Sequence, residues 1–216
     1  MIAAIFSDIH ANLPALEAFL SSTKDIAEMY VCLGDVVNYG PWNDECLELI
    51  YALPNSILLE GNHERLFRGD DPIDDELALV RQFYKHSLTH FTRKDLIQNL
   101  SAEYQLASFL CSHTIDQKRV YADTEIEIDQ NRIIGHTHHA FITNKSGKTL
   151  VNCGSVGQNR SQIDMFTYAL LDTVSATVSL HVRPYNFDRL IREMLVRNYP
   201  DSCIDYYLAK MRGQAS

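Results

Sequence analysis

Short apolar runs alternate with polar segments along the chain, and this alternation predicts its secondary structure. The first run, residues 2–6, is β-branched and aromatic and indicates a buried strand. The pattern then predicts strands at 30–33 and 57–59, and helices at 14–22 and from an N-cap at Asn43 or Asp44 to about residue 53. Strand and helix alternate at a spacing that predicts a largely parallel sheet with helices packed against it.

The rest of the chain continues this mixture of strands and helices. Strands are predicted at 108–112, 132–134 and 149–152, with an edge strand at 126–128 and an antiparallel hairpin at 166–171 and 177–183. Helices are predicted at 76–90, from Thr92 to residue 100, at 187–198 and at 201–211. Because no repeat, low-complexity tract or linker divides the chain, residues 1–216 are expected to form one α/β domain.

Polar side chains follow the apolar runs at five points, each where a predicted strand ends. They are Asp8 and His10, Asp35, Asn62 and His63, His113, and His136 and His138. Ligands bind at the carboxyl ends of strands in such sheets, so these side chains are expected to meet. Asp8 and His10 are two residues apart, as are His136 and His138. Since residues i and i+2 of an extended chain point the same way, each pair is expected to offer two ligands to one place.

The residue types at these strand ends indicate a metal site. Aspartate, asparagine and histidine without cysteine suit manganese, iron, cobalt, nickel or zinc better than calcium. The set predicts two metal ions about 3.5–4 Å apart, which can clamp a phosphoryl group and lower the pKa of a bridging water. Taken singly, each motif has an ordinary structural explanation, such as a turn at Gly61-Asn62, where both residues tolerate positive φ. Their shared position at strand ends favours the metal site.

The net charge limits the ligands of such a site. The formal charge of the chain is −9, which repels phosphate polymers, so stable nucleic-acid binding is not expected. A small phosphorylated substrate remains compatible with this charge, because bound divalent cations reverse the local sign.

The cysteines and the apolar runs of the chain indicate in which cellular compartment the protein is expected. The five cysteines are an odd number without a CxxC pair, so free buried thiols are expected and a disulfide framework is not. No apolar run is long enough to span a bilayer. The apolar N-terminal run lacks a basic leader and is interpreted as a strand, so a cytoplasmic protein is expected.

The five motifs, taken together and in order, resemble the signature of the calcineurin-like metallophosphoesterase superfamily. They are Ser7-Asp8-Ile9-His10, Gly34-Asp35, Gly61-Asn62-His63-Glu64, His113 and Gly135-His136-Thr137-His138. Residues 152–160 also resemble the Asn-Pro-Gly-Ser stretch of the small, single-domain bacterial and archaeal phosphodiesterases of that superfamily, with Cys153 in place of the proline. We expect that replacement to change packing and not catalysis.

The resemblance implies a fold, a ligand set and a reaction. The fold is a four-layer sandwich of two mixed β-sheets flanked by helices. The first metal is held by Asp8, His10, Asp35 and His138, and the second by Asp35, Asn62, His113 and His136. His63 is implied to be a catalytic residue near the substrate and not a ligand. The implied activity is phosphodiester hydrolysis, extending to phosphomonoesters, by attack of a hydroxide that bridges two divalent transition-metal ions, with manganese the preferred assignment.

Two departures lower the expectation of a protein phosphatase. Asn38-Tyr39-Gly40 stands where the protein Ser/Thr phosphatases and the symmetrical dinucleoside tetraphosphatases have Asp-Arg-Gly, so that phosphate-binding arginine is missing. Glu60 occupies the place before Gly-Asn-His where protein phosphatases carry an arginine. A non-catalytic scaffold, as in the phosphoesterase-like retromer subunit that lacks the counterpart of His63, and a nuclease of the same superfamily remain as alternatives.

Several residues near these motifs are candidates for substrate contact, each with a structural alternative. Arg160 is predicted to bind a phosphate oxygen, or else to pair with a surface carboxylate. His139 is expected to contact substrate, to support the ligands from outside, or to be exposed to solvent. Tyr39 and Trp42 are candidates for stacking on a base or an aryl group, or for wall packing. His86 and His90, at helical i, i+4 spacing, are interpreted as a solvated helix face.

Overall fold

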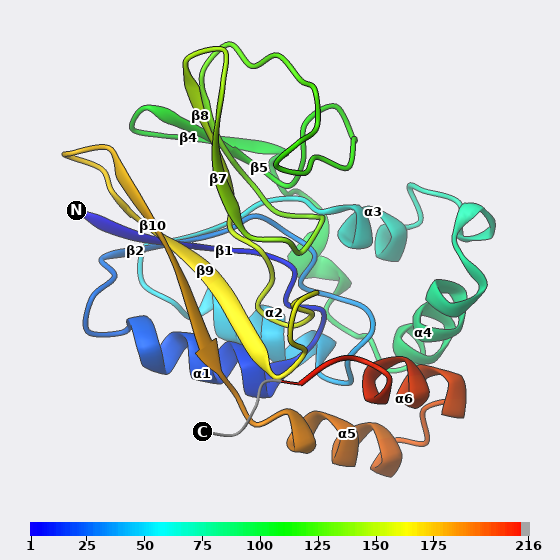
Figure 1. Ribbon diagram of the computed structural model, residues 1–216. Coiled ribbons are helices and arrows are strands. Elements are labelled where there is room, and N and C mark those ends of the chain that lie inside the picture. Colours follow the sequence, from blue (N-terminus) through cyan, green and yellow to red (C-terminus); the bar gives the residue numbers. More distant parts are fainter. Residues whose placement is uncertain (213–216) are drawn as a thin grey trace.

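The computed structural model describes residues 1–212, and its framework is two five-stranded sheets (Figure 1). The first sheet has the order β10-β9-β1-β2-β3. Its strands are β1 (Ile2–Phe6), β2 (Met29–Cys32), β3 (Ser56–Leu58), β9 (Met165–Asp172) and β10 (Thr177–Pro184). The strands β1, β2 and β3 are parallel, whereas β9 and β10 are antiparallel additions. The sequence therefore predicted the parallel part of this sheet and its terminal hairpin correctly.

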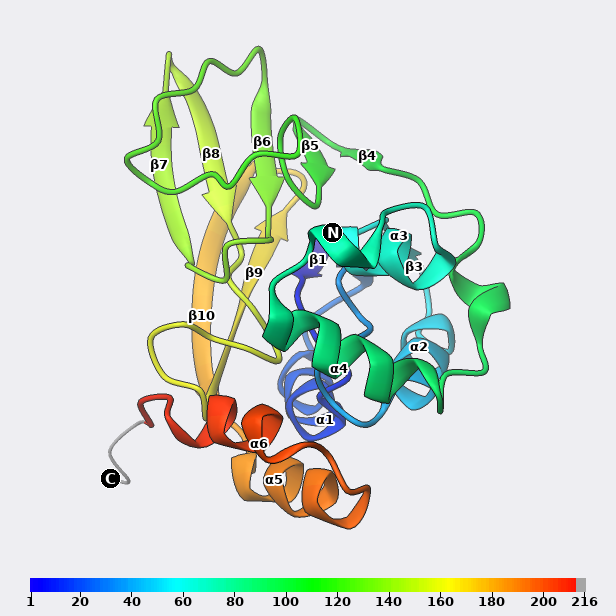
Figure 2. The same ribbon diagram turned by 90° about the vertical axis from the view of Figure 1, so that its right-hand side faces the viewer.

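The second sheet has the order β4-β5-β6-β8-β7 and is also mixed. Its strands are β4 (Glu103–Leu106), β5 (Phe109–Ser112), β6 (Asn131–Ile134), β7 (Phe141–Lys145) and β8 (Lys148–Asn152). β5, β6 and β8 are parallel, and β4 and β7 close the two edges in antiparallel pairs. Figure 2 shows this sheet standing above the helices that pack on the first sheet. The two mixed sheets implied by the resemblance are thus confirmed.

The sheets are held together by an apolar layer to which both contribute. Ala3 and Ile5 of β1 point into this layer together with Ile133 of β6 and Val151 of β8. The alternate residues of β1, Ala4 and Phe6, point to the opposite face and join the core beneath the helices. Side chains alternate across a strand, so an apolar run such as β1 can supply both cores at once.

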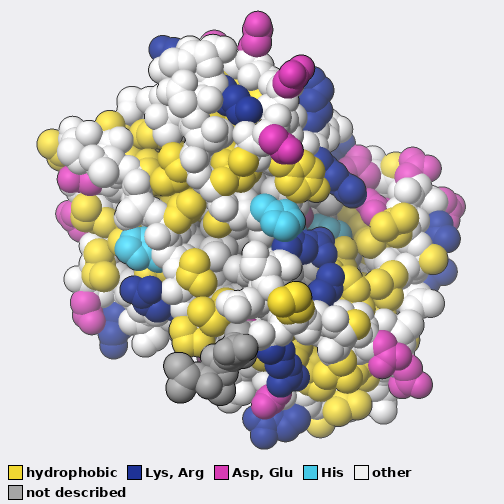
Figure 3. Space-filling model, in the orientation of Figure 1, with side chains coloured by type: hydrophobic (Ala, Val, Ile, Leu, Met, Phe, Trp, Pro, Cys, Tyr) yellow, Lys and Arg dark blue, Asp and Glu magenta, His cyan; other side chains and the backbone are white. Residues whose placement is uncertain are grey.

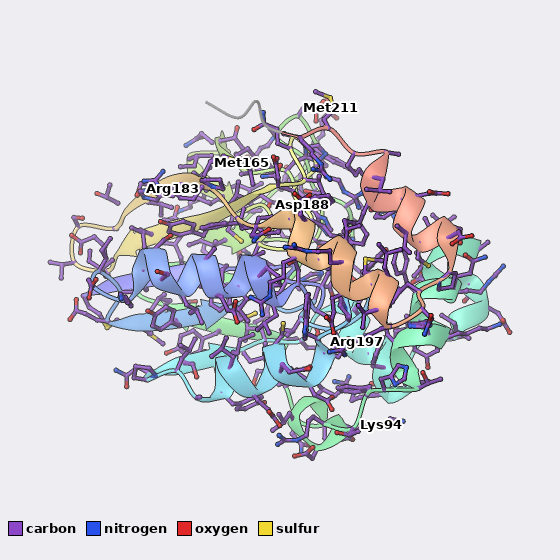
Figure 4. The ribbon with its side chains drawn as sticks, turned by 90° about the horizontal axis from the view of Figure 1, so that it is seen from below. Lys94, Met165, Arg183, Asp188, Arg197 and Met211 are labelled. Atoms are coloured by element: carbon purple, nitrogen blue, oxygen red, sulfur yellow. The ribbon has the colours of Figure 1, made fainter. Side chains whose placement is uncertain are left out.

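The helices gather on the outer face and the rim of the first sheet. They are α1 (Leu13–Thr23), α2 (Asn43–Tyr51), α3 (Asn62–Arg68), α4 (Ala78–Leu88), α5 (Phe187–Val196) and α6 (Asp201–Leu208), with two 3-10 turns at Ile73–Asp75 and Lys94–Ile97. Figure 4, from below, shows α1, α2 and α5 across this face, with Arg197 just past the end of α5. The outer face of the second sheet is covered by an irregular segment, from which Ile115, Val120 and Ile128 pack on Ile134 and Leu150.

Several expectations about local structure were wrong. The N-cap of α2 is Trp42: Asn43 instead accepts the backbone N–H of Asn38, and Asp44 accepts that of Thr92. Because Asp44 fixes the chain at Thr92, the helix expected up to residue 100 is reduced to the short 3-10 turn. The segment 126–128 forms no strand, since Ile128 is used to cover the second sheet.

Three short elements were missed from the sequence. The edge strands β4 and β7 carry polar, exposed residues and are recognisable only beside the strands that pair with them. The helix α3 has seven residues and begins inside the Gly61–Glu64 motif.

No helix of the described residues is long and apolar enough to cross a membrane.

Candidate metal centre

Ligand-type side chains from both sheets converge at the carboxyl ends of the parallel strands. Asp8 and Asp35 follow β1 and β2 of the first sheet, and Asn62 begins α3 after β3. His113 follows β5, and His136 follows β6 of the second sheet. The loops that the sequence singled out therefore do meet, because the two facing sheets place their strand ends on the same side.

The first cluster consists of Asp8, His10 and His138. The Nε2 atom of His138 lies 3.1 Å from Asp8 Oδ1 and 3.2 Å from Nε2 of His10. On the far side of the rings, His138 Nδ1 is 2.9 Å from the carbonyl of Gln158, and His10 Nδ1 is 3.4 Å from that of Val37. A carbonyl only accepts, so both Nδ1 atoms donate, and the neutral form of each ring carries its lone pair on Nε2.

This arrangement fits a cation. Among the described residues the buried Oδ1 atom of Asp8 has no hydrogen-bond partner, and it faces the Nε2 atoms of His138 and His10. With both rings neutral, three electron-pair donors converge here and repel one another, whereas a metal ion between them would be bound by all three. The carbonyls that fix the ring tautomers are the usual outer partners of metal-binding histidines.

The second cluster consists of Asp35, Asn62, His113 and His136. His113 Nδ1 is 3.1 Å from the carbonyl of Leu33 and donates to it, which turns Nε2 toward the cluster. That Nε2 lies 3.1 Å from Asn62 Oδ1, 3.1 Å from His136 Nδ1 and 3.2 Å from Asp35 Oδ2. These nitrogen and oxygen donors match the transition-metal ligand set expected from the sequence.

Asp35 lies between the two clusters. Its carboxylate is grouped with His113 and His136 on one side, and with His10 and His63 on the other, with all ligand atoms of each group within 4.8 Å of one another. Its Oδ1 atom accepts the backbone N–H of His63 at 2.9 Å, which orients the carboxylate. A carboxylate so placed can serve two ions at once.

The backbone at the ligands is left-handed and not extended as we expected. Asp8, His10, Asp35, His136 and His138 all have φ between 49° and 67°. A non-glycine residue in this region costs of order 1 kcal/mol and is concentrated at functional sites. The extended-chain argument was consequently wrong for His136 and His138, which belong to different clusters. Asp8 and His10 do share a cluster, but a left-handed turn brings them together.

Glu64 ties the loops of the site together, and the sequence analysis did not single it out. Its fully buried carboxylate accepts four backbone N–H groups, from Asp35 at 2.7 Å, Val36 at 2.8 Å, Gly61 at 2.9 Å and Val37 at 3.3 Å. It is the third residue of α3, where glutamate commonly reaches back to the N-cap. This position of Glu64 in the Gly61–Glu64 motif was the sequence signal by which its structural role could have been predicted.

Glycine permits the close approach of these loops. A Cβ atom on Gly61 would lie 2.2 Å from Asp35 Oδ1, and one on Gly34 would lie 2.4 Å from the backbone nitrogen of Gly61. Gly34 also has a φ of 106°, which side-chain-bearing residues rarely adopt. The loops that carry Asp35 and Asn62 therefore touch through their backbones.

The charged groups of the site perturb one another strongly. Burial opposes ionisation of Asp35, but His113 and His63 hold the pKa of its carboxyl well below the usual range. Burial likewise opposes the charged form of His113, yet the Asp35 carboxylate raises its pKa to about 9. Burial and the charge on His113 lower the pKa of His136 to about 4. In the metal-free chain, the proton on His113 therefore supplies part of the positive charge that a metal ion would bring to the cluster.

A cavity of about 820 Å³ opens over these clusters and reaches the surface. His10, Asp35, Asn62, His63, His113 and His136 line it. Figure 3, in the orientation of Figure 1, shows histidine side chains beside arginine or lysine side chains near the middle of the face turned toward the viewer. Asp8 is fully buried and does not line the cavity.

The three predicted substrate contacts, Tyr39, His139 and Arg160, also line this cavity. Tyr39 is nearly buried and stacks on Tyr206 with ring centroids 6.1 Å apart. His139 is exposed, and Arg160 Nη1 donates to Tyr206 Oη at 2.9 Å. Among the described residues Arg160 has no carboxylate partner, so the alternative of a surface ion pair is not seen. Arg119, which the sequence did not single out, lines the cavity as well.

Other candidates lie outside the site. Trp42 is buried away from the cavity, with the guanidinium groups of Arg189 and Arg197 5.5 and 5.9 Å from its ring centroid. His86 is half-buried against Tyr199, with ring centroids 4.0 Å apart, and α4 ends before His90. The interpretation of His86 and His90 as one solvated helix face was therefore correct only for the exposure of His90, since His86 is half-buried and His90 lies beyond the helix.

Comparison with known proteins adds a family to this geometry. The family model for the calcineurin-like phosphoesterase superfamily domain matches residues 1–176. An uncharacterised protein of Methanocaldococcus jannaschii is 26% identical over 92% of this chain and 93% of its own length. A metallophosphoesterase from Sphaerobacter thermophilus superposes with a TM-score of 0.78 at 24% identity, covering 97% of this chain and 98% of that one. A hypothetical protein from Pyrococcus horikoshii superposes with a TM-score of 0.83 at 18% identity over 99% of both chains.

Proposed function

The chain belongs to the calcineurin-like phosphoesterase superfamily, and from that premise we propose that it is a binuclear metal-dependent hydrolase of small phosphodiesters, active on phosphomonoesters as well. The observation that supports this best is the pair of ligand clusters joined by Asp35, with the buried Oδ1 atom of Asp8 facing the Nε2 atoms of His10 and His138. The metals would be held by Asp8, His10, Asp35 and His138, and by Asp35, Asn62, His113 and His136.

Two divalent ions, when bound, activate a water molecule and offset the negative charge of the phosphoryl group. The donor set contains nitrogen and oxygen only, and the five cysteines are buried outside the described ligand groups, so the set is compatible with manganese, which we take as the first candidate. Affinity alone does not decide occupancy, so iron, zinc, nickel and cobalt belong in the same assay.

The chain's own residues would bind and orient the substrate. His63 lines the cavity beside Asp35 and can donate a hydrogen bond to a phosphoryl or leaving oxygen. Arg160, with no carboxylate to neutralise it among the described residues, can bind a phosphate oxygen in a charge-assisted hydrogen bond. The aromatic wall of Tyr39 and Tyr206 can contact the organic part of the substrate.

The alternatives fit these observations less well. A scaffold has no use for a complete ligand set with His63, and both are present here. A nuclease must attract a phosphate polymer, whereas this chain carries a net charge of −9. A cytoplasmic protein that acts on a small phosphorylated compound therefore remains our proposal.

The test is a metal analysis followed by a substrate panel. Full-length protein purified without added metal is expected to contain transition metal, and to hydrolyse an activated aryl phosphodiester when manganese is supplied. The panel includes an aryl phosphomonoester, a cyclic nucleotide, and single-stranded and duplex DNA, so that the nuclease alternative is judged in the same experiment. Metal-loaded protein that is inactive on every phosphoester would refute the proposal.

A further inference from the structure

Asn38 makes a set of hydrogen bonds that bears directly on His63. The residue is fully buried and left-handed, with φ of 73°. Its backbone N–H donates to the side chain of Asn43 at 2.7 Å, which anchors the loop to the start of α2. Its side-chain amide lies 3.0 Å from Nδ1 of His63. Asn38 therefore contacts the ring nitrogen of His63 that lies away from Asp35.

The orientation of this amide is fixed by a second hydrogen bond. Asn38 Oδ1 accepts the backbone N–H of Tyr39 at 2.8 Å. A flipped amide would set its NH₂ group against that backbone donor, so the oxygen must face Tyr39 and the nitrogen must face His63. The amide nitrogen can only donate, and the Nδ1 atom of His63 must accept.

The opposite nitrogen of the ring then carries the proton. His63 Nε2 lies 3.9 Å from Asp35 Oδ2, on the side of the ligand clusters, and His63 lines the cavity. The rings of His10 and Tyr39 pack edge-on against the imidazole, with centroids 5.0 and 5.3 Å away. The ring is thus held both by packing and by the hydrogen bond from Asn38.

We propose that Asn38 is a positioning residue that fixes His63 as the Nε2–H tautomer, so that the imidazole presents a hydrogen-bond donor, and never a lone pair, to the substrate. This inference rests on the proposed function for the presence of a substrate oxygen above the ring. The state of the ring itself rests only on the contacts of Asn38.

The chemistry of residue 38 decides the direction of its hydrogen bond with His63. Asn38 stands where the Asp-Arg-Gly stretch of the protein Ser/Thr phosphatases and the symmetrical dinucleoside tetraphosphatases has its aspartate. An aspartate at this position would accept, and would therefore require a proton on Nδ1 of His63. The single change from carboxylate to amide reverses the direction of the hydrogen bond.

The test is long-range ¹H–¹⁵N NMR of the imidazole rings in the full-length protein, both metal-free and loaded with diamagnetic Zn²⁺. The His63 signals are assigned by their loss in His63→Gln. In the unsubstituted protein we expect Nδ1 to have the chemical shift of an unprotonated nitrogen and Nε2 that of a protonated one. In Asn38→Asp we expect Nδ1 to become protonated, with metal content unchanged within twofold.

A matched control separates this effect from that of a new carboxylate. Asn55 is exposed and also left-handed, with φ of 50°, so Asn55→Asp makes the same substitution in the same backbone conformation away from the site. The His63 signals of the Asn55→Asp variant are expected to match those of the unsubstituted protein. A protonated Nδ1 in the unsubstituted protein would overturn the proposal whether or not Asn38→Asp folds. Absence of hydrolysis in the substrate panel would overturn the proposed function and leave this tautomer standing.

Discussion

The carboxylate of Glu64 accepts the backbone N–H of Asp35 at 2.7 Å, so the residue between the two ligand clusters is held by its main chain. The same carboxylate binds the N–H groups of Val36, Val37 and Gly61. Burial and the nearby charge of Asp35 raise the pKa of Glu64 to about 7, despite these hydrogen bonds. The loops are therefore joined by a group whose charge is itself costly to bury.

Glu64→Gln should lower the free energy of unfolding and weaken metal binding. The amide NH₂ replaces one acceptor with a donor, so at least one buried N–H loses its partner, at a cost of about 1–3 kcal/mol for each. Urea unfolding of the metal-free protein measures the first effect, and metal titration measures the second. Glu125→Gln, at an exposed position, is the matched control, and equal stability of the two variants would contradict the assigned role.

Asp35→Asn should reduce occupancy of both metal positions together. The substitution removes one negative charge from between the clusters. It also replaces one carboxylate oxygen with an NH₂ group, either Oδ2, which faces His113, or Oδ1, which accepts the backbone N–H of His63. Metal content per chain, measured after gel filtration, is expected to fall well below that of the unsubstituted protein. Loss of only one metal would show that Asp35 serves a single cluster.

His63→Ala should retain metal and lose turnover. His63 is proposed to act on substrate oxygens, and removal of one such preorganised donor typically costs about 10²–10³-fold in kcat. Metal content and kcat on an aryl phosphodiester, measured beside Asp35→Asn, separate the two roles. A variant that loses metal in proportion to activity would instead make His63 a ligand.

The sequence could predict the ligands because they stand at the ends of apolar runs. β1 and β2 are strongly apolar, so Asp8 and Asp35 were readily placed at strand ends. The edge strand β7 was missed because its exposed polar residues are ordered by pairing with β8, which no local pattern reveals.

The grouping of the ligands depended on backbone conformation. The spacing of His136 and His138 indicated one shared target, but left-handed φ angles of 67° and 61° send them to different clusters. The contact of Asn38 with His63 and that of Glu64 with Asp35 were equally hidden, because each joins segments that are more than twenty residues apart. Such contacts form because two loops face each other in the folded chain, and no periodicity of the sequence predicts them.

Metal binding at the second cluster should release about one proton per chain at pH 8. The Asp35 carboxylate raises the pKa of His113 to about 9, so His113 is protonated at this pH, whereas Glu64, with a pKa of about 7, is largely ionised. The metal must displace the His113 proton, so its apparent affinity should rise about tenfold per pH unit below pH 9. The same proton stabilises the metal-free fold below the unfolded pKa of 6.5, and this stabilisation is lost as the pH rises through 9.

Calorimetric titration in buffers of different ionisation enthalpy measures this proton release. His113→Asn, titrated alongside, should release correspondingly fewer protons because it has no imidazolium to displace. Neutral His136, whose pKa is lowered to about 4, should contribute none at either pH 8 or pH 6. Metal binding that releases no proton at pH 8 would contradict the assigned state of His113.

Arg160→Ala should raise KM for a phosphodiester about tenfold while leaving metal content unchanged, because it removes one charge-assisted contact to a phosphate oxygen. Arg160 lines the cavity, and among the described residues its guanidinium donates only to Tyr206 Oη, so little of the fold depends on it. Steady-state kinetics with excess manganese gives KM and kcat separately. Arg192→Ala, at an exposed position of α5 outside the cavity lining, should change neither. If Arg160→Ala lowers kcat at unchanged KM, the guanidinium acts on the transition state and not on substrate binding.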